Sequence, residues 1–246
     1  AARRLDEGAV PTDRRCLVMD PEAGWNIAGA QTALYMSDIA KQAYRKGAIG
    51  EIAGLSSYRT QNVQTHTVGA HGGTPLVNGA AQNVTYATSK NSGAQDLITD
   101  GWTNSTLVLT EGDVFTIAGV FAVNPATRAT LPYLQQFVVN ADGTSSGAGA
   151  LTVNISPAIV TSGPYQTVSA APADNAAITV LGTASTGYPQ NLAFHKNAFA
   201  LVTCPLEMPD GVAFKAREQY KGLSVRVVKD YDITNDTDII RIDALY

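Results

Sequence analysis

Residues 47–55 read Gly47-Ala48-Ile49-Gly50-Glu51-Ile52-Ala53-Gly54-Leu55, and they join the end of a helical pattern to an apolar, strand-like run. Upstream of them, apolar residues recur at three- and four-residue steps, which is the pattern of an amphipathic helix. Gly47 can adopt the left-handed conformation that ends a helix, and Gly50 and Gly54 allow sharp turns around two isoleucines. The sequence therefore predicts a tightly packed structural corner at Gly47, Gly50 and Gly54.

The composition limits the classes of protein to which the chain can belong. It has 246 residues, of which 45% are hydrophobic and 15% charged, enough for one large domain or two small ones. So few charges, with abundant Ala, Gly, Thr, Asn and Ser, are typical of β-rich structural proteins. The net charge of -4 gives no basic footprint for nucleic acid. No membrane-spanning run or signal peptide is visible, and two cysteines are too few for a disulfide framework or a metal cluster.

The chain divides into three segments by composition. Residues 1–63 read as a helix end, a buried strand in the run 15–21 that Pro21 stops, the helix before Gly47 and an apolar run at 52–58, which together favour an α+β body. From residue 64 to residue 192 the only basic residues are Lys90 and Arg128, and Thr, Ser, Asn, Gly and Ala dominate. Residues 193–246 resemble residues 1–63 in composition. Because the chain begins without Met and stops inside a strand pattern, we expect a fragment that lacks both ends.

Short β-branched or alternating runs, separated by glycine-rich turns, recur through the middle segment. Such spacing predicts a small barrel or sandwich, and disorder is the alternative for a polar segment of low charge. In the third segment, alternation at residues 223–227 and 240–244 around a Thr-Asn-Asp turn predicts a β-hairpin with one buried face. The runs of the middle segment are residues 83–88, 105–109, 114–123, 136–139, 151–155 and 177–181.

Four motifs carry a resemblance to a known family. They are the glycine corner after an Ala-Tyr-Arg helix end, the run Phe-His-x-x-Ala-Phe-x-Leu-x-x-x-Pro-Leu at residues 194–206, Arg-Val-Val-x-Asp-Tyr-Asp at 226–232, and Asp-Ile-Ile-Arg-Ile-Asp-Ala-Leu-Tyr at 238–246. In this order they resemble the major capsid proteins of tailed double-stranded-DNA bacteriophages. The match covers both flanks, about half of the chain. The middle segment, similar only around residues 111–120, lies where the coat proteins of short-tailed phages carry an inserted β domain.

The resemblance implies a fold and a function. The fold would be the α+β Hong Kong 97-type capsid fold, its A-domain and part of its P-domain, formed by residues 1–63 and 193–246 around an inserted all-β barrel at 64–192. The function would be that of a structural subunit of an icosahedral shell that encloses the genome, without enzymatic activity or cofactor. The partners would be further copies of the chain, with scaffolding and portal proteins as candidates, and packaged DNA only non-specifically. The place would be the virion, assembled in the cytoplasm of the bacterial host.

For a shell subunit, the residues that matter are those that touch neighbours. The polar stretch 89–101 reads as a long loop, and its charged residues Lys90, Asp96 and Asp100 are our candidates for an inter-subunit contact; a surface loop without such a role is the alternative. Asp230, Asp232, Asp236 and Asp238 crowd one hairpin. They lack the glycine and glutamate of a calcium loop, so a solvated tip, weak cation binding, or pairing with a neighbour's arginines remain open.

Two other functions fit parts of the sequence. A β-rich tail or adhesin module that recognises carbohydrate is the first alternative, although the aromatic residues of the middle segment, Trp102, Tyr86, Tyr133 and Tyr165, are scattered along the chain. A hydrolase is the second, because residues 143–147 match the Gly-x-Ser-x-Gly nucleophile elbow around Ser145. That motif needs a strand-to-helix turn, whereas here it separates two strand-like runs. His66 and His71 match no standard zinc spacing, and solvated loop histidines are expected.

Overall fold

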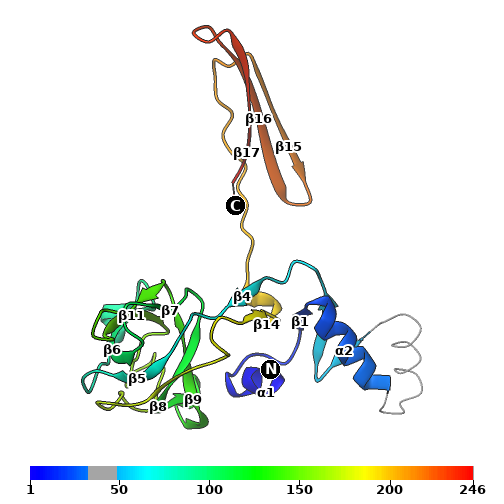
Figure 1. The fold of residues 1–246 in the computed structure, drawn as a ribbon. Helices are drawn as coiled ribbons and strands as arrows, with labels where there is room; N and C mark the ends of the chain where they lie inside the picture. The colour runs from blue at the N-terminus through cyan, green and yellow to red at the C-terminus, as the bar shows by residue number, and fades with distance from the viewer. Residues whose placement is uncertain (33–48, 246) are drawn as a thin grey trace. The chain divides into compact units, whose positions relative to one another are not determined.

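The computed structural model describes residues 1–32 and 49–245 (Figure 1). The predicted helix end at residues 43–45 and the first corner glycine, Gly47, lie outside these ranges. The described chain forms two compact units, residues 1–195 and residues 196–246. Within the described ranges, no helix is long and apolar enough to cross a membrane.

A four-stranded sheet joins distant parts of the first unit. Its order is β14 (Leu192–His195), β1 (Arg15–Met19), β3 (Leu55–Arg59) and β2 (Glu51–Ile52). β1 runs parallel to β3 and antiparallel to β14, so one short apolar strand lies between two segments far apart in the sequence. Helices α1 (Ala2–Glu7) and α2 (Pro21–Thr32) precede and follow β1. A small buried cluster contains Met19, Ala28 and Ile49.

The two described corner glycines lie on either side of β2. Ile52 pairs with Leu55, so Ala53 and Gly54 form a two-residue hairpin turn, with φ of 51° and 74°. Positive φ at both central residues matches the right-handed twist of the strands. Gly50 has φ of 70°, and Ile49 just before it is buried. Because Gly47 is not described, the larger role of the corner stays a prediction.

The segment between β3 and β14 forms an all-β body with its own core. Its main sheet has six strands with antiparallel neighbours, and an isolated antiparallel bridge between Leu76 and Ala177 connects the two ends of that sheet. Two further strand pairs lie beside it, β4 (Thr65–Thr67) with β13 (Gly187–Pro189) and β7 (Leu107–Leu109) with β10 (Gly143–Thr144). In sheet order the six strands are β12 (Ile178–Val180), β8 (Val114–Val123), β9 (Thr130–Val139), β11 (Leu151–Ser156), β6 (Gln95–Trp102) and β5 (Gly73–Val77).

Five of the six strand-like runs predicted for this segment coincide, in whole or in part, with observed strands, and β8 has the predicted bounds. The prediction for residues 83–88 is wrong, because Tyr86–Ser89 form the helical turn α4. The N–H groups of Thr88 and Ser89 bond to the carbonyl of Thr85, so this backbone satisfies itself locally. The segment therefore has no need of a strand partner.

The predicted loop at residues 89–101 is also wrong over most of its length, since β6 begins at Gln95. Buried and exposed residues alternate along β6, and the polar members of the buried set have partners. The side chain of Gln95 accepts from Ile159 N–H at 2.8 Å and donates to the Gln82 carbonyl at 3.1 Å. Thr99 Oγ1 accepts from Trp102 Nε1 at 2.8 Å. Polar side chains whose hydrogen bonds are satisfied can replace apolar ones on the inner face of a strand. The apolar alternation that identifies a strand in the sequence is then lost.

A fully buried carboxylate, that of Asp113, holds the entry to β8. Its Oδ2 accepts from Thr110 N–H at 2.8 Å and from Gly69 N–H at 3.0 Å, and its Oδ1 lies 2.8 Å from Nε2 of His66. His66 is therefore not the solvated loop residue that the sequence suggested. His71 likewise has a partner, the carbonyl of Gly182 at 3.2 Å.

Helix α1 contacts both the four-stranded sheet and the all-β body of the first unit. The Arg4 guanidinium lies 3.4 Å from the ring centroid of Tyr133 on β9, and Asn124 donates to the Glu7 carbonyl at 3.1 Å. Asp6 pairs at 2.6 Å with Arg15, the first residue of β1. The helix therefore contacts both the four-stranded sheet and the β8–β9 hairpin.

The second unit is a three-stranded antiparallel sheet. β15 (Phe214–Tyr220), β16 (Leu223–Asp232) and β17 (Thr237–Ala244) follow one another in space and in sequence, after the short 3-10 helix η1 (Lys196–Ala198). The predicted hairpin is confirmed as β16–β17, and β15 is an addition that the sequence did not predict. The predicted buried face is wrong for β17, because Ile239, Ile240 and Ile242 are each more than half exposed. A single sheet layer cannot cover its own side chains.

We expect the substitution Asp113→Ala to lower the free energy of unfolding by about 2–5 kcal/mol, because the N–H groups of Thr110 and Gly69 would stay buried without an acceptor. Urea unfolding of the 246-residue chain measures the change. The matched control is Glu111→Ala, an exposed acidic residue two positions away, with an expected change within about 0.5 kcal/mol. Equal effects of the two substitutions would contradict the role given to Asp113.

Candidate interaction surfaces

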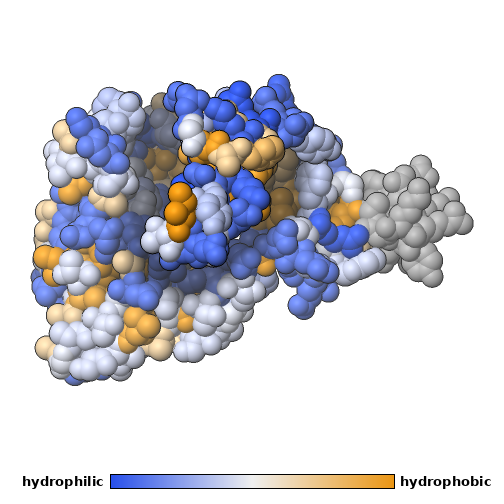
Figure 2. All heavy atoms as spheres, turned by 90° about the horizontal axis from the view of Figure 1, so that it is seen from above, coloured by the Kyte–Doolittle hydropathy of each residue, from blue (hydrophilic) through white to orange (hydrophobic). Residues whose placement is uncertain are grey.

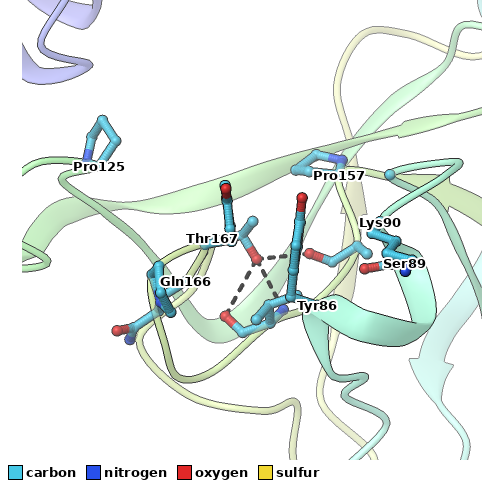
Figure 3. Close-up of a pocket in the computed structure, with 12 residues that line it drawn as sticks. Tyr86, Ser89, Lys90, Pro125, Pro157, Gln166 and Thr167 are labelled. Carbon is cyan, nitrogen blue, oxygen red and sulfur yellow. Dashed lines mark hydrogen bonds between the residues drawn. The ribbon is translucent and has the colours of Figure 1, made fainter.

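A pocket of about 300 Å³ opens on the all-β body beside α4 (Figure 3). Its walls come from the α4 region, the β8–β9 turn and the loop after β11, which are far apart in the sequence. We name it the tyrosine pocket. The residues that give it its character are Tyr86, Lys90, Pro125, Pro157, Pro164 and Tyr165.

The two tyrosines lie in contact at the pocket. Their ring centroids are 3.8 Å apart with an interplanar angle of 14°, and Tyr86 and Tyr165 are 40% and 57% exposed. A hydrogen bond with the side chain of Tyr165, helped by partial desolvation, raises the pKa of Tyr86. Sequence reasoning missed this pair, since aromatic residues 79 positions apart carry no spacing signal. The expectation that the aromatics of this segment are scattered is therefore wrong for these two, although Trp102 is buried elsewhere.

The polar side chains of the pocket wall are used internally. Thr167 Oγ1 donates to the carbonyl of Ala158 at 2.7 Å and accepts from Val160 N–H at 2.9 Å, and Gln166 Nε2 donates to the carbonyl of Val168 at 2.9 Å. Proline at three wall positions fixes φ there. The pocket is thus preformed, and a ligand would not need to order it.

The pocket is also where the few positive charges of this segment occur. Residues 64–192 contain two basic side chains, Lys90 in the pocket wall and Arg128, three residues after the wall residue Pro125 in the same turn. Against them stand six acidic residues, Asp96, Asp100, Glu111, Asp113, Asp142 and Asp174. A carboxylate is therefore the charged group best suited to the pocket mouth.

The structure separates the three predicted contact residues. Lys90 follows α4 and is exposed, whereas Asp96 and Asp100 point outward from β6 on either side of the half-exposed Ile98. Asp96 accepts a hydrogen bond of 2.7 Å from Asn154 on β11. Among the described residues, no ion pair joins Lys90 to either aspartate. Their role between subunits stays a prediction.

Ser145 has a structural role. It is buried, donates to the carbonyl of Thr103 at 2.5 Å and accepts from Thr106 N–H at 3.2 Å. It follows β10, and no helix begins there. A nucleophile elbow requires the serine hydroxyl to stand free above a strand-to-helix turn, so this geometry does not support a hydrolase.

The aspartates of the β16–β17 hairpin shape its turn. Asp232 accepts from Asn235 Nδ2 at 2.6 Å and from Thr234 N–H at 2.9 Å, and these bonds lower its pKa. Asp236 accepts from the Tyr231 hydroxyl, and Asp238 pairs with Lys229 at 2.9 Å. Within the described residues, no group of three or more His, Cys, Asp or Glu could hold a metal ion.

Exposed apolar side chains occur on both units, and on the face shown in Figure 2 they lie between polar neighbours. The most exposed large one is Ile233 in the β16–β17 turn, at 85%. Among the described residues, Leu201 and Val202 follow at 78% and 75%, and then Tyr220 and Ile242 at 70% each. Exposed apolar surface of this extent is typical of proteins that associate.

A family model described as "P22 coat protein - gene protein 5" matches residues 1–246. The "Major capsid protein" of Acyrthosiphon pisum secondary endosymbiont phage 1 is 26% identical over 248 residues, which cover 96% of this chain and 58% of that protein. The chain thus spans less than two thirds of this relative. A solved structure, "CUS-3 coat protein I-domain", is 30% identical and covers 44% of this chain and 95% of its own, with a TM-score of 0.31.

An ion-pair network in the second unit predicts a pH effect. Hydrogen bonds from Arg226, at 2.5 Å and 3.2 Å, and from Arg241, at 2.6 Å, lower the pKa of Asp243. A carboxyl group whose pKa is lower in the folded state stabilises the fold above its ordinary pKa, and that contribution is lost as the pH falls through the lowered value. We expect the NMR titration of Asp243 to have its midpoint below the ordinary value for aspartate.

The substitution Arg226→Met should return that midpoint toward the ordinary value, because it removes the largest cause of the shift. Lys215→Met is the control, since Lys215 pairs with the exposed Asp210 instead. An Asp243 midpoint that does not respond to Arg226→Met would contradict the assignment.

Proposed function

The chain belongs to the P22 coat protein family, and from this membership we propose that it is part of the structural subunit of an icosahedral phage capsid. The family match over residues 1–246 is the observation that carries the proposal. The function of such a subunit is repeated self-association around the genome, and its chemistry lies in complementary surfaces. A coat protein family is structural and not enzymatic.

We propose the Hong Kong 97-type fold for residues 1–63 and 193–246, with residues 64–192 as an inserted barrel. The strand order supports the insertion, since the chain leaves through β3 and returns through β14, and both strands pair with β1. The bridge between Leu76 and Ala177 supports a closed barrel, because it links the edge strand β5 to the residue before β12, at the opposite edge.

The wider setting follows from the same proposal. The partners are other copies of the subunit, with scaffolding and portal proteins as candidates, and DNA is enclosed without specific recognition. The protein would be found in the virion and would assemble in the bacterial cytoplasm. Carbohydrate binding by a tail or adhesin module is the second candidate, favoured by the stacked Tyr86 and Tyr165 alone. A glycan-array screen of the chain tests it.

Expression of the full-length protein in bacteria, followed by electron microscopy, tests the main proposal. We expect closed shells or shell fragments of regular curvature. A full-length protein that stays monomeric, alone and with its phage's other structural proteins, would contradict the proposed function.

The predicted contact can be tested in the same full-length protein. We expect the double substitution of Asp96 and Asp100 by Ala to reduce particle yield or heat resistance, because exposed carboxylates of β6 would no longer meet cations of a neighbour. Glu111→Ala, at an exposed turn of the same body, is the control. Particle yield and heat resistance equal to those of the control would count against Lys90, Asp96 and Asp100 as an inter-subunit contact.

A further inference from the structure

The turn at residues 230–238, which we name the acidic tip, presents the aliphatic side chain of Ile233 among carboxylates. Ile233 is 85% exposed, and the turn carries Asp230, Asp232, Asp236 and Asp238. The turn is held in shape by the bonds of Asp232 to Thr234 and Asn235. An exposed isoleucine on a rigid turn gains free energy wherever it meets an apolar cavity.

The tyrosine pocket has the complementary character. Its wall of tyrosines and prolines is apolar, the side chains of Gln166 and Thr167 donate hydrogen bonds within the wall, and Lys90 supplies a positive charge. A ligand that fits it would combine an aliphatic side chain with nearby carboxylates. Of the described surfaces, the acidic tip combines these features with the highest exposure of its apolar side chain.

We propose that the acidic tip of one copy of the chain binds in the tyrosine pocket of a second copy, with Ile233 against the tyrosine pair and the carboxylates of the tip beside Lys90. This inference rests on the proposed function, because it needs a protein that associates with itself. The contact joins two different copies of the chain. The acidic tip belongs to the second unit of one copy, and the tyrosine pocket belongs to the first unit of the other copy.

The free energies of apolar burial and of ion pairing show which part of the contact contributes more to binding. Burying one isoleucine contributes about 1.5–3 kcal/mol, whereas an exposed ion pair contributes about 0.2–1 kcal/mol. The isoleucine therefore supplies affinity, and Lys90 supplies the choice of partner. A second candidate tip, Ile98 between Asp96 and Asp100, is less suited because it lies on a strand face and is half exposed.

Sedimentation of the 246-residue chain, up to about 1 mM, measures the contact. We expect concentration-dependent association that Ile233→Ser weakens at least about tenfold, the loss of one buried aliphatic side chain. Lys90→Glu should weaken it about three- to tenfold, and more so at low salt. Matched controls are Ile240→Ser, an exposed isoleucine within β17, and Lys221→Glu, in the turn between β15 and β16.

A mixing experiment separates this contact from any other mode of association. The Lys90→Glu chain keeps an intact tip, and the Ile233→Ser chain keeps an intact pocket, so an equal mixture should associate more strongly than either variant alone. Thermal unfolding of each variant, which changes an exposed residue, should match that of the wild type.

Several outcomes would overturn the inference. They are a wild-type chain that stays monomeric, association that Ile233→Ser leaves unchanged, and a mixture no stronger than its components. In full-length protein, normal shells with Ile233→Ser would reject this contact while leaving the proposed function intact. Absence of shells from the wild-type protein would reject the function instead.

Discussion

The pairing of β1 on both of its edges is the constraint on which the first unit depends. Residues 15–18 pair with β14 on one side, and residues 15–19 pair with β3 on the other. Between these two partners the chain makes a body of well over one hundred residues and then returns to the same small sheet. Closing a loop of this length costs little more conformational entropy than closing a short loop. A compact body can therefore be accommodated there, provided that its two ends emerge close together.

The start of β1 is fixed by a buried cation. Arg15 is only 4% exposed, and its guanidinium donates to the carbonyls of Val10 and Pro11 and to the carboxylate of Asp6. Buried charge of this kind is tolerated only when its donors are satisfied. These bonds hold α1 against β1, and α1 in turn contacts the β8–β9 hairpin through Arg4. The four-stranded sheet and the all-β body are therefore connected by a second route besides the two chain crossings.

The sequence predicted best what apolar alternation and turn residues control. The strand at residues 15–19, the strand at 114–123 and the hairpin of β16 and β17 were predictable because their β-branched residues alternate or run together. β6 was not, because Gln95 and Thr99 occupy inner positions, and their hydrogen-bond partners, Gln82, Ile159, Leu151 and Trp102, come into place only once the chain has folded. The same limit explains why the tyrosine pocket could be predicted only in part from the sequence. Lys90 could be selected as an unusual charge, but the pairing of Tyr86 with Tyr165 depends on tertiary structure alone.

The distribution of charge would make the proposed association between copies selective. A protein of net charge -4 repels its own copies at most relative positions, and the body between β3 and β14 carries three acidic residues for each basic one. Like charges placed opposite one another disfavour incorrect contacts more than opposite charges favour correct ones in water. Because the body between β3 and β14 has only two cations, an acidic surface that approaches this body finds few positions without repulsion. Apolar side chains such as Ile233 can then supply the affinity at those positions without promoting association elsewhere.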